Sequence, residues 1–160
     1  MADVSAKPVT RRVAIAGGRI TIGSRAMRLL RTGALPKGDP LAMAEIAGIQ
    51  AAKKTPELLP LCHPIALNRV AIRSVVRAKA GAVDVYCVAE IAAQTGVEME
   101  ALTGVNVALL TIWDLIKPVN AALEIGDVRL LYKSGGKSGT WLNPEGFPGE
   151  VKVLIAEFNP

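Results

Sequence analysis

Asp114 and Lys117 stand three residues apart near the end of an apolar stretch with helical spacing. On a helix, this spacing places a carboxylate and an ammonium group on the same face, about one turn apart. Each group then changes the proton affinity of the other, so the aspartate can accept a proton while the lysine donates one or holds an anion. An ordinary surface ion pair is the simpler alternative, and helix statistics alone favour it.

A second candidate lies at residues 127–139, where a strand-like segment runs into a glycine turn. Lys133 and Lys137 flank the glycine pair at 135–136. Glycine lets backbone N–H groups approach a guest closely, and two ammonium groups supply the charge that binds a phosphate. The stretch is not a nucleotide-triphosphatase P-loop, because Leu131 stands where the first glycine belongs and no helical pattern follows. A flexible turn with solvated lysines is the open alternative.

Further titratable residues stand at the expected ends of elements. Glu98 and Glu100 share one face of an extended segment but not of a helix, so their geometry depends on where a helix begins. Carboxylates are also favoured near a helix N-terminus for structural reasons alone. His63 is the only histidine and stands beside a proline, where the chain passes from helix to strand. Lys37 lies just before an expected helix N-terminus, a position suited to an anion.

The distance between two of these carboxylates bears on assembly. Glu100 and Asp114 fall in one expected helix, 14 residues apart, which separates them by about 21 Å. One small substrate cannot place its reacting centre at both. If both residues serve one pocket, a second chain must supply one of them, which predicts an oligomer with its active site at an interface.

Helices and antiparallel strands are the elements expected to position these residues. Segments 67–78 and 83–93 alternate around a short turn and predict a hairpin. Strands are also expected at 10–16, before a turn at Gly17-Gly18, at 127–133, and at 151–156 as an edge strand. Because strands and helices do not alternate regularly, we expect an α+β fold, an antiparallel sheet with helices packed on one face.

Three helices are expected from capping signals and spacing. The first is capped by Thr21 or Ser24 and ended by Gly33. Asp39 followed by a proline starts the second, which runs to residue 54. The third covers residues 98–117 and is the most apolar, and Pro118 stops it.

Composition limits the class of protein. A chain of 160 residues with 51% hydrophobic content suits a single domain, 1–160, with a packed core. The longest near-continuous apolar stretch, 105–113, is too short to span a membrane. Arg11 and Arg12 are not followed by the apolar region of an export signal. Cys62 and Cys87 lack zinc-site spacing and predict no disulfide framework. We therefore expect a cytoplasmic protein without a metal site.

The basic charge does not predict a nucleic-acid partner. The net charge is +5, but the 19 basic residues are scattered and aromatic content is only 4%. Binding to single strands requires stacking aromatic residues beside a basic groove. A small anionic substrate accounts equally well for the surplus charge. A non-catalytic nucleotide or RNA binding module that uses the lysines and arginines is the remaining alternative to an enzyme.

Four blocks of the chain closely resemble one known family. They are KGDPLAMAEIAGIQAAKKTPEL at 37–58, PLCHP at 60–64, TGVEMEALT at 95–103 and KSGGKSG at 133–139. The family is molybdenum cofactor biosynthesis protein C, the cyclic pyranopterin monophosphate synthases, and the similarity extends from about residue 3 to residue 141. The resemblance implies a ferredoxin-like fold and a homohexamer, a trimer of dimers, with the active site at a subunit interface.

The resemblance also implies an activity and a set of site residues. The family is a lyase that converts (8S)-3′,8-cyclo-7,8-dihydroguanosine 5′-triphosphate to cyclic pyranopterin monophosphate and releases pyrophosphate, a reaction without a redox step that implies no cofactor. By position, the resemblance makes Asp114, Lys117 and Lys37 catalytic. Residues that would bind substrate are Leu61, Cys62, His63, Glu98, Met99, Glu100, Lys133, Arg12 and, with less support, Lys137. Trp113 and Pro118 depart from the family pattern. Because Pro118 directly follows Lys117, it affects how the helix ends and therefore the direction of the Lys117 side chain.

Overall fold

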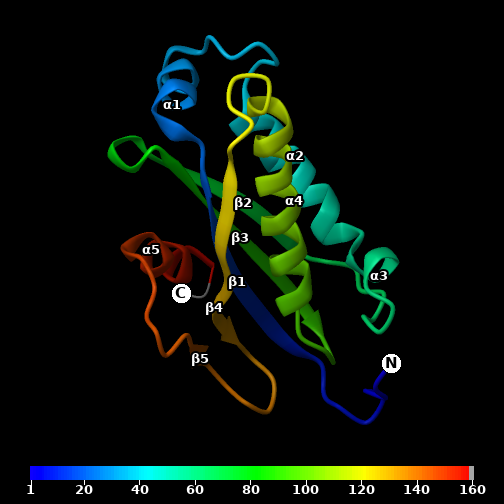
Figure 1. The fold of residues 1–160 in the computed structure, drawn as a ribbon. Helices are drawn as coiled ribbons and strands as arrows, with labels where there is room; N and C mark the ends of the chain where they lie inside the picture. The colour runs from blue at the N-terminus through cyan, green and yellow to red at the C-terminus, as the bar shows by residue number, and fades with distance from the viewer. Residues whose placement is uncertain (159–160) are drawn as a thin grey trace.

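The computed structural model describes residues 1–158, so residues 159 and 160 of the expected domain lie outside the described residues. Five antiparallel strands form one sheet in the order β2-β3-β1-β4-β5 (Figure 1). The elements along the chain are β1 (Thr10–Thr21), α1 (Gly23–Thr32), α2 (Pro40–Lys53), α3 (Thr55–Leu58), β2 (Arg69–Arg77), a 3₁₀ turn (Ala78–Ala80), β3 (Ala82–Ala93), α4 (Glu98–Ile116), β4 (Glu124–Ser134), β5 (Trp141–Leu142) and α5 (Gly149–Phe158). The first four strands and the long helices follow the order of a ferredoxin-like fold, which confirms the predicted α+β class.

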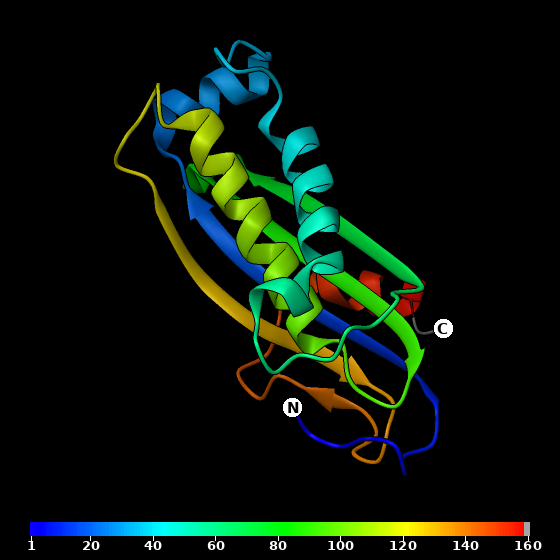
Figure 2. The ribbon, with the colours of Figure 1, turned by 90° about the vertical axis from the view of Figure 1, so that its right-hand side faces the viewer.

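The two long helices, α2 and α4, lie side by side on one face of the sheet (Figure 2). The core between the layers is apolar and fully buried, with Ile20 from β1, Val85 from β3 and Leu109 from α4 all inaccessible to solvent. Alternate residues of each strand point to this face, while 3.6-residue spacing brings one stripe of α4 onto it. The layers therefore hold α4 rigidly, with one end toward α1 and the other toward α3.

The long helix α4 is a core helix. Within the described chain it is the one helix long and apolar enough to cross a membrane, by length and composition alone. Half of that apolar window is buried inside the fold, where residues such as Val105 and Ile112 pack on the sheet. Its apolar character is thus accounted for by the packing of the fold.

Several local predictions are confirmed. The Asp39 side chain accepts hydrogen bonds from the backbone N–H groups of Leu41 (2.8 Å) and Ala42 (3.3 Å), so it caps α2 as expected. Gly33 ends α1 with φ of 66°, the left-handed conformation that suits glycine. The predicted hairpin is β2 and β3, paired antiparallel. The predicted cap of α1 is wrong, because its N-cap is Ile22 and no side chain bonds there.

The predicted turn at Gly17-Gly18 is wrong, because β1 continues through both glycines to Thr21. The strand is paired on both sides, with β3 and with β4, and this pairing outweighs the local tendency of two glycines to turn. A side chain at Gly18 would come within 2.8 Å of a Leu109 methyl group. Glycine is therefore required here for the close approach of α4 to the sheet.

The predicted edge strand at 151–156 is also wrong, because these residues belong to the helix α5. Val151, Leu154 and Phe158 are buried, and their spacing suits a helix rather than a strand. They pack against the second face of the sheet, where Ile15 and Tyr132 are buried in the same apolar cluster. Arginines of β2 hold α5 through ion pairs with Glu150 and Glu157, so long-range packing decides the conformation of this segment.

The crossing of α2 and α4 depends on Gly48. A Cβ atom there would lie 2.7 Å from the Ile72 Cδ1 atom and 2.9 Å from the Gly104 carbonyl oxygen. We expect Gly48→Ala to lower the free energy of unfolding by about 1–3 kcal/mol, because overpacking outweighs the better helix propensity of alanine. Urea denaturation measures this change. In the control Gly149→Ala, no atom lies within 4 Å of the added Cβ, and a loss of similar size there would contradict the packing argument.

Candidate active site

The C-terminal end of α4 carries a carboxylate between two lysines. Lys117 Nζ lies 2.7 Å from Asp114 Oδ1, and Lys37 Nζ lies 2.9 Å from Asp114 Oδ2. Lys37 also donates to the Asp114 backbone carbonyl at 3.0 Å. The expected one-turn spacing of Asp114 and Lys117 is thus present, and the loop before α2 adds Lys37 from 77 residues away. Each carboxylate oxygen has its own ammonium partner.

This arrangement favours the ionised form of Asp114. The hydrogen bond from Lys117, and then the one from Lys37, hold the pKa of Asp114 below its ordinary value. The three side chains are each about half exposed, from 40% to 53%, so a ligand from solution can reach them. The cluster therefore presents a carboxylate ready to accept a proton, beside two cations that can donate one or stabilise negative charge.

A second polar cluster lies at the N-terminal end of α4. Lys133 Nζ from β4 lies 3.0 Å from Glu98 Oε1 in the first turn of the helix. Arg12 of β1 donates to the backbone carbonyls of Ala93 (3.1 Å) and Gln94 (3.3 Å), which holds its guanidinium group at the same end of the sheet. A small cavity of about 50 Å³ is lined by Arg12, Lys133 and the exposed Lys137.

The glycine turn after β4 shapes this cationic cavity. Gly135 and Gly136 have φ of 94° and 71°, a region that side chains strongly disfavour. A side chain on Gly136 would also collide with the Arg12 guanidinium group. The turn predicted from the two glycines is present, and it brings Lys133 and Lys137 to one cavity with an arginine. Three cations around one cavity suit a polyphosphate.

The remaining predicted residues line an adjoining pocket of about 180 Å³. Gly96 and Glu98 line both this pocket and the cationic cavity, so the two spaces meet at the start of α4. The loop after α3 contributes one wall and the first turn of α4 the other. The predicted residues that line the pocket are Leu61, Cys62, His63, Glu98, Met99 and Glu100.

The start of α4 decides the geometry of its two carboxylates. Because the helix begins at Glu98, Glu98 and Glu100 point in different directions, and Glu100 is buried with 3% exposure. Burial raises the pKa of Glu100, since a charge is costly away from water. Burial and then the nearby Glu100 also raise the pKa of the Cys62 thiol. The pKa of Glu100 is thus shifted upward, in contrast to the pKa of Asp114 at the other end of the helix, which is shifted downward.

Together the predicted residues form two clusters rather than one. Asp114 and Glu100 are 14 residues apart along α4, which is about 21 Å. Figure 1 shows α4 as one continuous helix, with its C-terminal end toward α1 and its N-terminal end toward α3. Within residues 1–158 of one chain, the three predicted catalytic residues therefore lie far from the predicted substrate-binding residues.

Comparison with known proteins identifies the family of the chain. A family model described as the MoaC family matches residues 1–136. The chain belongs to the MoaC family. The matched part ends after the glycine turn, so β5 and α5 lie beyond it. The family predicted from four sequence blocks is thereby confirmed.

Curated members of the MoaC family are similar over most of their length, and those compared are named cyclic pyranopterin monophosphate synthase. The chain is 49% identical to the protein of Parvibaculum lavamentivorans over 141 residues, 88% of each chain. It is 47% identical to that of Pelobacter propionicus over 146 residues, 91% of each chain. It is 48% identical to that of Rhodospirillum rubrum over 141 residues, 88% of this chain and 85% of the other. These relatives are enzymes by name.

Three residues of the site in this MoaC family member were not predicted from the sequence. Ile65, Thr95 and Gly96 line the pocket beside the predicted residues. A side chain on Gly96 would collide with the Glu98 carboxylate, so this glycine makes room for the ion pair with Lys133. Two of them could have been predicted from their place in the sequence, because Thr95 and Gly96 begin the block at 95–103 that contains both glutamates.

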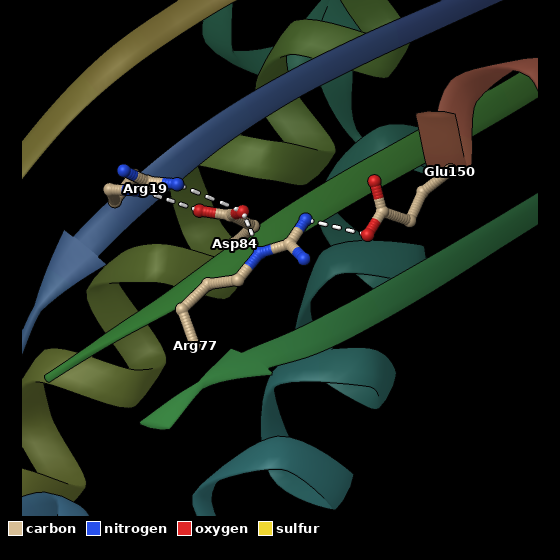
Figure 3. A network of polar contacts seen from close by, with 4 residues as sticks. All are labelled: Arg19, Arg77, Asp84 and Glu150. Atoms are coloured by element: carbon tan, nitrogen blue, oxygen red, sulfur yellow. Dashed lines mark hydrogen bonds and ion pairs between the residues drawn. The ribbon is translucent and has the colours of Figure 1, made fainter. Parts of the chain in front are cut away.

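A separate polar network lies on the second face of the sheet. Figure 3 shows Asp84 of β3 between two arginines, with Arg19 at 2.6 Å and Arg77 at 2.7 Å, and Arg77 continuing to Glu150 of α5. Burial alone would raise the pKa of Asp84, but the two guanidinium groups outweigh it and lower the pKa. The network joins three strands to α5, so we interpret it as structural.

A cavity of about 260 Å³ lies beside this network. Its two arginines are already paired, Arg19 with Asp84 and Arg129 with Glu145. None of the predicted site residues lines it. The candidate active site is therefore on the other parts of the fold, at the two ends of α4.

Burial of Glu100 predicts a dependence of stability on pH. Because its pKa is raised in the folded protein, the folded state binds the proton more tightly, and stability falls as pH rises from the unfolded pKa through the folded one. We expect Glu100→Gln to be more stable than wild type at pH 7, and equally stable below about pH 4. Thermal unfolding across this pH range measures the difference. The control for loss of a charge is Glu45→Gln, at an exposed position of α2. A Glu100→Gln gain independent of pH would contradict the explanation.

Proposed function

We propose that this chain is a cyclic pyranopterin monophosphate synthase, a cytoplasmic lyase of molybdenum cofactor biosynthesis. Its substrate is (8S)-3′,8-cyclo-7,8-dihydroguanosine 5′-triphosphate, and its products are cyclic pyranopterin monophosphate and pyrophosphate. The names of the relatives support this proposal. The observation that carries it is that all the expected residues lie in two clusters with complementary chemistry. One is the cationic cavity with its adjoining pocket, and the other is the carboxylate between two lysines.

The cationic cavity suits the triphosphate. Arg12, Lys133 and Lys137 offer fixed and mobile positive charges around one space, and charge-assisted hydrogen bonds to phosphate oxygens are strong. Glu98 holds Lys133 in the free protein, so phosphate would replace this carboxylate as its partner. The same cations stabilise the charge that develops on pyrophosphate as it leaves.

The adjoining pocket suits the guanine-derived ring system. Leu61 and Met99 are exposed apolar side chains, 72% and 41% accessible, which provide surface for a flat ring. Burial raises the pKa of Glu100, so this side chain holds a proton more readily than an exposed glutamate does. A neutral carboxylic acid can donate a proton to a ring nitrogen or oxygen during opening and rebuilding of the ring. This pocket therefore combines apolar contact with a proton donor.

The cluster at the other end of α4 suits proton removal. In formation of the cyclic phosphate, a ribose hydroxyl oxygen bonds to the α-phosphorus, the bond to pyrophosphate breaks, and the hydroxyl proton must be accepted. Asp114 can take that proton because its lysine partners, which lower its pKa, keep the carboxylate in the ionised form that has a site for a proton. Lys37 and Lys117 are placed to stabilise the negative charge of the reacting phosphate.

Both clusters serve one substrate only if two chains pair. A two-fold axis across α4 places the C-terminal end of one helix against the N-terminal end of the other, which completes two sites per dimer. The outer surface of the helix layer offers apolar area for such contact, since Met43, Ile46 and Leu110 are 49%, 54% and 57% exposed. The proposed homohexamer is then a trimer of these dimers.

Incubation of the purified protein with the cyclised triphosphate tests this function. We expect equimolar formation of the pterin, read by fluorescence after oxidation, and of pyrophosphate, read by a coupled assay. Sedimentation of the same sample is expected to give the mass of six chains. Tight binding of the triphosphate without any product would instead favour a non-catalytic nucleotide binding module, and binding of arbitrary RNA that weakens steeply with salt would favour an RNA binding module.

A further inference from the structure

The N-terminal segment, residues 1–9, lies beside the pocket at the start of α4. Both views place the N-terminus at the same end of the molecule as the loop after α3 (Figures 1 and 2). The backbone carbonyl of Ala2 lies 2.8 Å from Nε2 of His63, 61 residues along the chain. A residue that lines the candidate pocket is therefore held by a segment that the reaction scheme above does not use.

This contact defines the protonation of the His63 ring. A carbonyl oxygen only accepts hydrogen bonds, so Nε2 must carry the proton. In the neutral ring the lone pair is then on Nδ1. Within residues 1–158, the bond to Ala2 is the only hydrogen bond found for this imidazole. The orientation of the ring thus depends on the N-terminal segment.

Gln94 ties the segment to the sheet. Its side-chain amide donates to the carbonyls of Ser5 at 3.2 Å and Lys7 at 2.9 Å. The segment is otherwise mostly exposed. Apart from the bond to His63, its other hydrogen bonds within residues 1–158 are internal, such as those from Ser5 to the Asp3 carboxylate. A segment with so few hydrogen bonds to the fold detaches at a small cost in free energy. Gln94 is therefore the residue that holds it in its observed position.

Gln94 also stands between the two halves of the pocket. Its backbone carbonyl accepts from Arg12, which lines the cationic cavity. The next two residues, Thr95 and Gly96, line the pocket that contains His63. One residue therefore contacts the phosphate side through its backbone and the N-terminal segment through its side chain.

We propose that residues 1–9 form a strap beside the substrate pocket that orients His63 through the Ala2 carbonyl. Gln94 is the positioning residue that fastens this strap. A ring fixed before the substrate arrives loses less conformational freedom on binding, which strengthens binding. The effect on turnover rests on the function proposed above, whereas the effect on His63 does not.

The single histidine allows a direct test by NMR. With ¹⁵N-histidine labelling, one type of imidazole is observed. In the wild type we expect a protonated Nε2 whose proton exchanges slowly enough to be seen. In Gln94→Ala, in Gln94→Glu, which keeps the size of the side chain but cannot donate, and in a variant lacking residues 2–5, we expect this proton signal to be lost to exchange. The exposed Gln50→Ala on α2 is the matched control.

Kinetics provide the second measurement. We expect KM for the triphosphate to rise about 10-fold in the two Gln94 variants, a factor that corresponds to the free energy of one hydrogen bond. We expect a much smaller change in kcat, because the residues that carry out the chemistry stay in place. An imidazole proton signal that survives in all three strap variants would overturn the strap. A lost signal with unchanged KM would overturn its role in binding. A wild type without turnover would overturn the proposed function, and the NMR result would still decide the strap.

Discussion

Asp114→Asn is expected to lower kcat by about 10³-fold, within the range for loss of a general base. The amide keeps the size of the side chain and can still accept from one lysine, but it cannot take a proton. Because Asp114 is at the surface and its two lysines are solvated, the fold and the assembly should persist. Product formation in single turnover, together with circular dichroism and sedimentation, measures both parts of this expectation.

The control for Asp114→Asn is Glu145→Gln. Glu145 is 77% exposed and also forms an ion pair, with Arg129, at 3.0 Å, so it matches the change of charge in a surface pair. We expect wild-type kcat in this control, because Arg129 and Glu145 lie outside both clusters. Turnover retained by Asp114→Asn would remove this residue from the chemistry and favour the ordinary surface ion pair.

Mixing two inactive variants is expected to restore activity. Lys37→Ala damages the cluster at the C-terminal end of α4, and Lys133→Ala damages the cationic cavity at its N-terminal end. If each site takes one end from each chain, a mixed dimer has one intact site and one doubly damaged site. An equal, randomly assembled mixture should then recover about a quarter of wild-type activity, since half of the dimers are mixed.

The matched control combines two variants of the same cluster. Lys37→Ala mixed with Asp114→Asn leaves every site damaged, because both residues belong to the same end of α4. We expect no recovery in that mixture. Each pair is co-expressed with two different affinity tags, so that the recovery is measured on the random mixture and mixed oligomers can also be purified and assayed separately. Purified mixed oligomers of Lys37→Ala and Lys133→Ala that remain inactive would contradict a site shared between chains.

Local signals in the sequence predicted most of the elements that carry the site. Asp39 and the proline after it start α2, and the helical spacing of apolar residues outlines α4, because capping and periodicity depend on near neighbours. The glycine turn between Lys133 and Lys137 was predicted for the same reason, since positive φ angles demand glycine. These elements already place the two clusters at opposite ends of one helix.

Packing over long distances overruled two local predictions. The glycine pair at 17–18 lies inside β1, because strands on both sides pair with it and α4 needs the space. Residues 151–156 form part of α5, because an apolar second face of the sheet buries positions with helical spacing. In both segments the deciding partners are distant in sequence.

The sequence by itself determined the family, the α+β class, and the residue types at each end of α4, because short-range patterns and four blocks that resemble the family carry that information. Only the tertiary structure decided that Lys37 joins Asp114, that Glu100 is buried, and that Ala2 reaches His63. The physical reason is that burial and hydrogen bonding depend on which distant segments the sheet and helices bring together. Local propensity does not contain that information.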